Sequence, residues 1–200
     1  MEERIFELVA GHPALDLVNT LDWRFRPNGQ EEFLAAYADL LAFAEQERLL
    51  SPKQARELKR ITSAKPGELA LAECRELREA LADAIYAQLD GRRPPATAVR
   101  TLDRLFHAAR QKQRLLWSGD RFQWEWLGPE VAAELPVWLL ANASSELLLS
   151  ESMQKVRACN NPECRWLFLD TSKNHTRRWC DMKVCGNRMK ARRFKAQHKS

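Results

Sequence analysis

Residues 159–195 read CNNPECRWLFLDTSKNHTRRWCDMKVCGNRMKARRFK. This stretch holds four of the five cysteines of the chain, spaced as C-x4-C-x15-C-x4-C. Two close cysteine pairs joined by a longer loop are typical of a structural zinc site, in which four ligands surround the ion as a tetrahedron. The spacing predicts one structural Zn2+, held by Cys159, Cys164, Cys180 and Cys185.

Two other uses of these cysteines are weaker alternatives. Two disulfides would fit their number, but disulfides are rare in a reducing cytoplasm. The chain starts with MEERIFELVAGHPALDL, which lacks the basic-then-apolar layout of a secretory signal, so we expect a cytoplasmic protein. A nucleophilic cysteine needs a paired base, and His175 is the nearby candidate. We expect His175 to be exposed, with a role as a replacement ligand as the alternative.

The composition is that of a soluble globular protein. Of the 200 residues, 45% are hydrophobic and 30% are charged, which excludes a disordered chain. No apolar run reaches the roughly 18 residues that a membrane span needs, so we expect no membrane partner. The fifth cysteine, Cys74, lies in a helical pattern and is expected to be a small buried hydrophobe.

Residues 151–200 are expected to form a treble-clef-like zinc finger, made of a knuckle, a β-hairpin and an α-helix. The turn residues Asn160, Asn161 and Pro162 bend the chain between the first two cysteines. Residues 166–169 and 175–179 are predicted to be the two strands of the hairpin, and the helix begins at Cys185. Fifty residues bury little apolar surface unaided. We therefore expect Cys180→Ser to unfold this part and to leave the helices of residues 1–150 intact.

Residues 1–150 are predicted to be a mainly helical domain with one small β-hairpin. Helical patterns cover residues 12–25, broken at 27–29, and 31–49. Ser51 and Pro52 open a third helix, and a break at 65–67 precedes a long helix over 68–89. Thr97 is expected to cap a helix over 98–112. A hairpin over 114–128 then precedes a helix from Pro129 to about residue 150, bent near Pro136.

The charge of the chain is divided between its two parts. Residues 151–200 hold 13 of the 32 Lys and Arg and 4 of the 27 Asp and Glu, a net charge of +9, so residues 1–150 carry −4. A basic segment of this kind is the electrostatic footprint of a nucleic-acid-binding module, and a solvated helix face or a site for an acidic protein is the alternative. The residues expected to contact nucleic acid are Lys173, Arg177, Arg178, Asn187, Arg188, Arg192, Lys195 and Lys199.

The C-terminal motifs resemble a known family. The segments CRWLFLDTSKN, RRWCDM and CGNRMKARRF are similar to the CGNR zinc-finger family, whose tetrapeptide stands intact at residues 185–188. The opening GHPALDLVNTL, residues 11–21, followed by several helices and a hairpin, resembles the ABATE domain that usually precedes this finger. The resemblance covers almost the whole chain and implies four cysteine ligands for zinc. It also implies a bacterial, stress-induced transcriptional regulator.

A second site is a sharper hypothesis for the polar residues of the opening helix. Asp16, Asn19 and Arg24 would line a pocket for a small-molecule effector, close to the tryptophan-rich hairpin of residues 117–126, whose rings hold organic molecules well. A polar stripe is more often the solvated side of a helix, or satisfies buried backbone groups. The sequence does not force these elements together.

Three functions follow from these observations, in decreasing order of support. The first is a DNA-binding regulator whose N-terminal part senses a small molecule or forms a homodimer. The second is a module that binds RNA or an acidic protein without DNA specificity. The third is an enzyme with a structural zinc. It is disfavoured because the sequence offers no Gly-rich phosphate loop, no Ser-His-Asp arrangement and no open metal position.

Overall fold

The structure, a computed structural model, describes residues 4–27, 29–126 and 132–198. Within these residues the chain is mostly helical, with three two-stranded antiparallel sheets, and the predicted fold class is confirmed. The helices are α1 (Pro13–Asn19), α2 (Tyr37–Gln46), α3 (Pro52–Ile61), α4 (Ala64–Leu89), α5 (Ala96–Arg110), α6 (Leu135–Leu149) and α7 (Asn187–Gln197). The strand pairs are β1 (Leu21–Asp22) with β2 (Glu31–Glu32), β3 (Gln113–Trp117) with β4 (Phe122–Trp126), and β5 (Val156–Ala158) with β6 (Leu167–Leu169).

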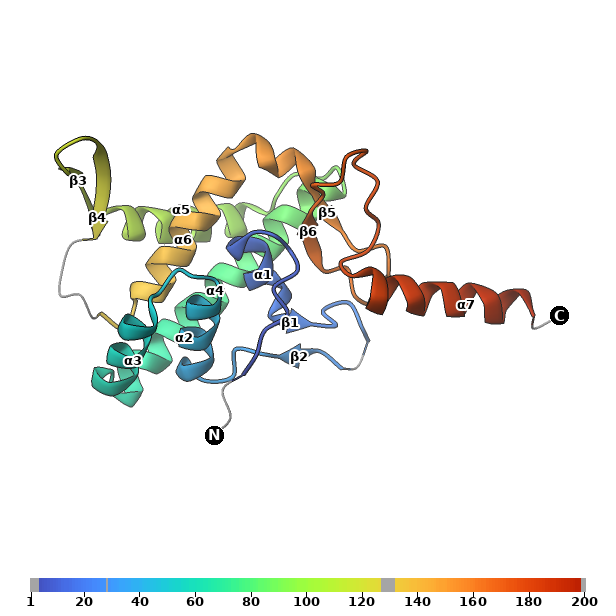
Figure 1. The fold of residues 1–200 in the computed structure, drawn as a ribbon, viewed down its shortest axis with the longest axis horizontal. Coiled ribbons are helices and arrows are strands. Elements are labelled where there is room, and N and C mark those ends of the chain that lie inside the picture. The colour runs from blue at the N-terminus through green and yellow to red at the C-terminus, as the bar shows by residue number, and fades with distance from the viewer. Residues whose placement is uncertain (1–3, 28, 127–131, 199–200) are drawn as a thin grey trace.

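The long helix α4 is the centre of the N-terminal part, and α1, α5 and α6 pack against it (Figure 1). Its buried side includes Leu77, Leu81 and Ile85, all without solvent exposure. The break predicted at residues 65–67 is wrong, because α4 already begins at Ala64. Pro66 is tolerated there because the first turn of a helix leaves its N–H groups without intrahelical partners.

Local capping explains where two other helices begin. The side chains of Ser51 and Gln54 cap each other's backbone at the start of α3, with Pro52 in its first turn, as predicted. The helix predicted over residues 31–49 begins only at Tyr37, where Asp39 accepts the N–H of Ala36 at 2.8 Å. Residues 31–32 form β2 instead.

Three further predicted bounds differ from the structure. The opening helix ends at Asn19, because β1 follows it and Trp23 takes a positive φ of 51°. The N-cap of α5 is Pro95 rather than Thr97. Pro136 lies in the first turn of α6 and does not bend that helix, while the start predicted at Pro129 lies outside the described residues. The hairpin predicted over 114–128 is present as β3 and β4.

The C-terminal part has its predicted hairpin, but with a different pair of strands. β6 pairs with β5 in the register Val156↔Leu169 and Ala158↔Leu167, so the knuckle lies between the strands. Residues 175–179, predicted to be the second strand, form no strand. They pass beside the knuckle, where the carbonyl of Arg178 accepts the N–H of Asn160 at 2.9 Å. The short 3-10 helix η1 (Glu151–Lys155) precedes β5, and the π-helical turn η2 (Met182–Gly186) leads into α7.

The C-terminal part is docked on α1 and shares its hydrophobic core. Leu167 and Phe168 are fully buried and belong to the same cluster of apolar side chains as Leu15 and Leu17 of α1. The buried side chain of Asn19 donates to the carbonyl of Leu167 at 3.0 Å and accepts its N–H at 2.8 Å. The two parts therefore make one continuous core.

Two peripheral contacts extend this docking. The N–H of Leu169 donates to the carbonyl of Ala10 at 2.8 Å, which continues the hydrogen bonding of β6 into the N-terminal segment. The indole of Trp166 donates to Asp22 at 2.8 Å. No helix among the described residues is long and apolar enough to cross a membrane.

We predict that Asn19→Ala lowers the free energy of unfolding of the full chain by roughly 2–4 kcal/mol, because it leaves a buried N–H and a buried C=O of Leu167 without partners. Urea unfolding followed by circular dichroism checks this. The matched control is Asn142→Ala, whose amide bonds only to Glu146 on an exposed helix surface. Equal stabilities of the two variants would contradict the role given to Asn19.

Candidate metal centre and basic helix

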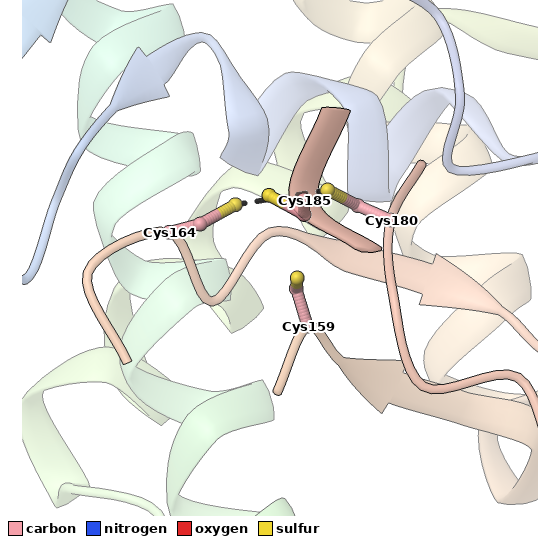
Figure 2. Close-up of side chains that lie close together, drawn as sticks. All are labelled: Cys159, Cys164, Cys180 and Cys185. Carbon is pink, nitrogen blue, oxygen red and sulfur yellow. Dashed lines mark hydrogen bonds between the residues drawn. The ribbon is translucent and has the colours of Figure 1, made fainter. Parts of the chain in front are cut away.

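Four thiols converge at one point of the C-terminal part (Figure 2). The Sγ atoms of Cys159, Cys164, Cys180 and Cys185 all lie within 4.8 Å of one another, and all four residues are buried. The Sγ atoms of Cys164 and Cys180 are 3.7 Å apart. A tetrahedral zinc with Zn–S bonds of about 2.3 Å has S···S edges of about 3.8 Å. The cluster is therefore capable of binding one zinc ion.

The knuckle between the first two cysteines is built around the buried residue Asn161. Its carbonyl accepts the N–H groups of Cys164 and Arg165, both at 3.0 Å, and its side-chain oxygen accepts that of Glu163. Its side-chain nitrogen lies 3.6 Å from the Sγ of Cys185 and donates to it. Asn161 thus shapes the first pair and also orients a sulfur of the second pair, as partners of metal ligands usually do.

The second cysteine pair is shaped by the turn that leads into α7. Asp181 accepts the N–H of Val184 at 2.8 Å and so caps the π-helical turn that carries Cys185. A β-carbon on Gly186 would meet the Sδ of Met182 and lie 3.3 Å from Trp179. The glycine of the CGNR tetrapeptide therefore allows the close packing of this turn.

The sulfurs are strongly coupled to one another. Hydrogen bonds from Cys164, Cys180 and Cys185 hold the pKa of Cys159 far below its usual range. The hydrogen bond between Cys164 and Cys159 also holds the pKa of Cys164 far above its usual range, because Cys164 donates the proton in that bond. Without a cation the cluster keeps some of its protons, since several thiolates in so small a volume repel one another. A dication replaces those protons and lets all four sulfurs ionise.

Arg177, one of the residues predicted to bind nucleic acid, is occupied inside the protein. Its guanidinium donates to the carbonyls of Trp179, Cys180 and Val9 and stacks 4.2 Å from the ring centroid of Phe168. Arg177 therefore ties the segment before α1 to the loop that carries Cys180.

Two basic residues of α7 also contact the protein. The guanidinium of Arg188 lies 4.8 Å above the ring of Trp23, and Arg192 forms an ion pair of 2.5 Å with Glu163. Both residues are exposed. Lys173, Arg178, Asn187 and Lys195 are exposed as well, whereas Lys199 lies outside the described residues. His175 is exposed, as expected, and is not a member of the sulfur cluster.

The three residues predicted to line an effector pocket have partners within the protein. Asn19 binds the backbone of Leu167, and Arg24 forms an ion pair with Glu79 of α4. Asp16 and Asn19 line a cavity of about 10 Å3. This is room for about one water molecule. The tryptophan-rich hairpin does not border it, because β3 and β4 stand at one end of the molecule while α1 lies near its middle (Figure 1). An effector site here stays a prediction that would need these side chains to move.

A pair of carboxyl groups, the buried Asp16 and the half-buried Glu47, lies at this cavity, and no motif in the sequence pointed to it. Burial, and then the neighbouring carboxyl of Asp16, raise the pKa of Glu47 to about 8. Burial also raises the pKa of Asp16 to about 6, against the hydrogen bonds that it accepts from Ala10 and Val9. Among the residues that the structure describes, one buried oxygen of Glu47 has no hydrogen-bond partner. The pair therefore holds a proton in the folded protein near neutral pH.

Other contacting residues were also missed from sequence. The contacts of Trp23 with Arg188 and of Asp22 with Trp166 were not predicted, and neither was the hydrogen bond of the turn residue Asn161 to the Sγ of Cys185. The only feature of the sequence that could have pointed to Trp23 is its position next to the opening motif. Its role could not be predicted from that, because its partner Arg188 lies 165 positions further along the chain.

The comparisons with known proteins agree with this geometry. Residues 11–151 match the family model of ABATE, described as "Putative stress-induced transcription regulator". Residues 155–198 match that of the CGNR zinc finger. No curated protein matches the chain. The resemblance inferred from the motifs is thereby confirmed, and neither of the matched families is an enzyme family.

We predict that Cys180→Ser lowers the zinc content of the purified full chain well below one ion per chain, because it removes one of four ligands. Elemental analysis under reducing conditions measures this. The control is Cys74→Ala, which removes the buried thiol of α4 outside the cluster and should leave one zinc bound. Because the core is shared, we also expect Cys180→Ser to lower the melting temperature of the N-terminal helices. This replaces the expectation that residues 1–150 would be unaffected.

We predict that the Asp16–Glu47 pair makes the protein less stable as the pH rises from 6 to 8. The pKa of a carboxyl in the unfolded chain is about 4.3. The folded state therefore binds more protons in this window, and stability falls as they leave. Glu47→Gln should raise the stability at pH 8 by about 1 kcal/mol and change it less at pH 6. Thermal melts check this against the exposed control Glu68→Gln, and a shift that is equal at both pH values would refute it.

Proposed function

This chain belongs to the ABATE family, and we propose that it is a regulator that binds duplex DNA through α7 while its sulfur cluster holds one structural zinc. The observation that carries the proposal is the projection of α7 from the body of the molecule (Figure 1). The helix starts two residues after the last cysteine of the cluster and is exposed along most of its length.

The composition of α7 supports contact with a phosphate backbone. Its 11 residues include no acidic residue and five basic ones, namely Arg188, Lys190, Arg192, Arg193 and Lys195. A helix of this size is about 16 Å long, close to half a turn of B-DNA. Lysine and arginine side chains of this density release counterions from DNA, which is the main source of affinity for such modules.

The anchoring of α7 supports a fixed docking geometry. Zinc would fix Cys185 at the start of the helix, Arg188 stacks on Trp23, and Arg192 pairs with Glu163. A helix held at its first turn presents its remaining cations at constant spacing, which suits a regular backbone. Arg178 and Lys173 lie exposed in the loop that precedes the second cysteine pair and would extend the contact. Asn187 and Arg188 remain the candidates for contacts with base edges.

The N-terminal part would then be the regulatory part. Its net charge is −4, which disfavours a contact between this part of the chain and DNA. Sensing of a small molecule and formation of a homodimer are the two roles that we propose for it. An enzymatic role is disfavoured, since all four positions around the zinc would be filled by sulfur and none would be open to water or substrate.

We predict that the double variant Lys190→Gln, Lys195→Gln weakens binding of the full chain to duplex DNA. The slope of the logarithm of the binding constant against the logarithm of the salt concentration should become less steep by about 2, since each lysine contacts about one phosphate. Fluorescence anisotropy at several salt concentrations measures both. The control is Lys53→Gln, Lys59→Gln in α3, which removes the same charge from the N-terminal part.

Two results would contradict the proposal. One is the absence of salt-dependent DNA binding by the wild-type chain with zinc bound. The other is an equal loss of affinity in the control variant, which would show that only net charge matters. A competition between duplex DNA, structured RNA and single strands distinguishes the alternative, an RNA-binding module, because RNA would then displace the duplex.

A further inference from the structure

The loop after β1 is a part of the ABATE domain that reaches the basic helix. It opens with a tight turn, in which the N–H of Arg26 donates to the carbonyl of Trp23 at 2.8 Å. The guanidinium of Arg188, in the first turn of α7, lies over the ring of Trp23. The loop and the start of α7 therefore lie side by side (Figure 1). Residues 23–26, WRFR, are defined here as the arginine loop.

Three residues of the arginine loop are held by the rest of the protein. Arg24 forms an ion pair with Glu79 of α4. The ring of Phe25 packs edge to face against Tyr86 of the same helix, with centroids 4.9 Å apart. Trp23 has a positive φ of 51°, a backbone conformation that a bulky residue keeps only where its surroundings impose it. The loop is therefore fixed in one position beside α7.

Arg26, the fourth residue of the loop, is exposed and stacks on the same indole as Arg188. Its guanidinium carbon lies 5.4 Å from the ring centroid of Trp23, and that of Arg188 lies 4.8 Å from it. Within residues 4–27, 29–126 and 132–198, neither guanidinium has an ion-pair or hydrogen-bond partner. Two arginines that are distant in sequence are thus brought to one ring, with N–H groups available to bind an anion.

The net charge of the N-terminal part does not describe this loop. Residues 23–30 read WRFRPNGQ, with two arginines and no acidic residue. The ion pair with Glu79 neutralises Arg24, whereas Arg26 keeps its full charge. A nucleic acid that approaches α7 therefore meets a positive edge of the ABATE domain, although the domain as a whole is negative.

The carboxylate of Glu163, in the knuckle, lies among these cations. It pairs with Arg192 of α7. That hydrogen bond, and then the charges of Arg192, Arg26 and Arg188, lower the pKa of Glu163. Three cations around one carboxylate leave an excess of positive charge, which a phosphate group neutralises.

We propose that Arg26 is a second anchor for the nucleic acid, and that its guanidinium contacts a phosphate of the duplex that α7 binds. This inference rests on the proposed binding of duplex DNA by α7. Stacking on the indole of Trp23 orients a guanidinium and leaves its N–H groups able to donate two parallel hydrogen bonds to a phosphate. The ABATE domain then contacts the DNA directly, and the interface includes both parts of the chain.

The regular spacing of phosphates suits two guanidinium groups at one ring. Each strand of B-DNA has a phosphate about every 3.4 Å along the helix axis, so Arg26 and Arg188 reach neighbouring phosphates of one strand. The rival role for Arg26 is purely structural, as a cover for the indole of Trp23. The two roles differ in one respect, because only the contact with phosphate depends on the charge of Arg26.

The experiment measures binding of the zinc-loaded full chain to duplex DNA by fluorescence anisotropy at several salt concentrations. We expect Arg26→Gln to make the slope of the logarithm of the binding constant against that of the salt concentration less steep by about 1, because one phosphate contact is lost. For the same reason, binding at about 0.1 M salt should weaken about 5- to 10-fold.

Three further variants separate charge from packing. Arg26→Lys keeps the charge and should keep the slope of the wild type. Arg26→Met removes the charge but leaves an apolar side chain over the indole, and should behave as Arg26→Gln does. The control is Arg121→Gln, which removes the same charge from the exposed tip of the hairpin β3–β4, at the other end of the molecule from α7 (Figure 1). It should leave the slope and the affinity close to those of the wild type.

The outcomes distinguish this inference from the proposed function. If the Lys190, Lys195 double variant loses affinity as expected while Arg26→Gln and Arg26→Met bind with the slope of the wild type, α7 binds DNA without Arg26 and the inference is wrong. It is also wrong if Arg26→Lys or Arg121→Gln loses as much affinity as Arg26→Gln, since packing or net charge would then explain the loss. A wild-type chain without salt-dependent binding would instead overturn the proposed function, and this inference with it.

Discussion

The constraint on which the structure depends is the meeting of four cysteine sulfurs within 4.8 Å of one another. Buried thiolates at such distances repel each other, so the cluster needs a cation or must keep its protons. A zinc ion satisfies all four sulfurs at the observed spacing, and in doing so it joins two segments that are distant in sequence: the knuckle between β5 and β6, and the segment between β6 and α7. The position of the basic helix depends on this junction, together with the stacking of Arg188 on Trp23 and the ion pair of Arg192 with Glu163.

The zinc finger is not a separate tail, because it completes the core of the ABATE domain. Asn19 of α1 exchanges two hydrogen bonds with Leu167, and Phe168 is buried between the two parts. Arg177 then links the carbonyl of Val9 to that of Cys180. A change in the N-terminal part has a short path to α7 through these contacts and through the stacking of Trp23 on Arg188. The ABATE domain and the finger are therefore expected to respond to ligands and to metal loss as one unit.

The features that depend on local residue spacing could be predicted from the sequence. The four cysteines, the capped start of α3, the long helix α4 and the hairpin β3–β4 all follow from patterns within a few tens of residues. The errors concern contacts between distant segments. The pairing of β6 with β5 depends on the docking of β6 against Ala10 and Asn19. Arg177 was predicted to be a free surface cation, because the groups that accept its hydrogen bonds are backbone carbonyls, which the sequence does not reveal. The Asp16–Glu47 pair was hidden for the same reason, since only burial in the fold raises the pKa of two ordinary carboxyl groups.

The most direct test heats the zinc-loaded full chain while two signals are followed together, the helical circular dichroism and the release of zinc to a coloured chelator. If the finger completes the core, zinc should leave at the temperature at which the helices melt, and removing zinc beforehand should lower that temperature. Release of zinc from a protein whose helices stay intact and melt at an unchanged temperature would show that the finger is not part of the core.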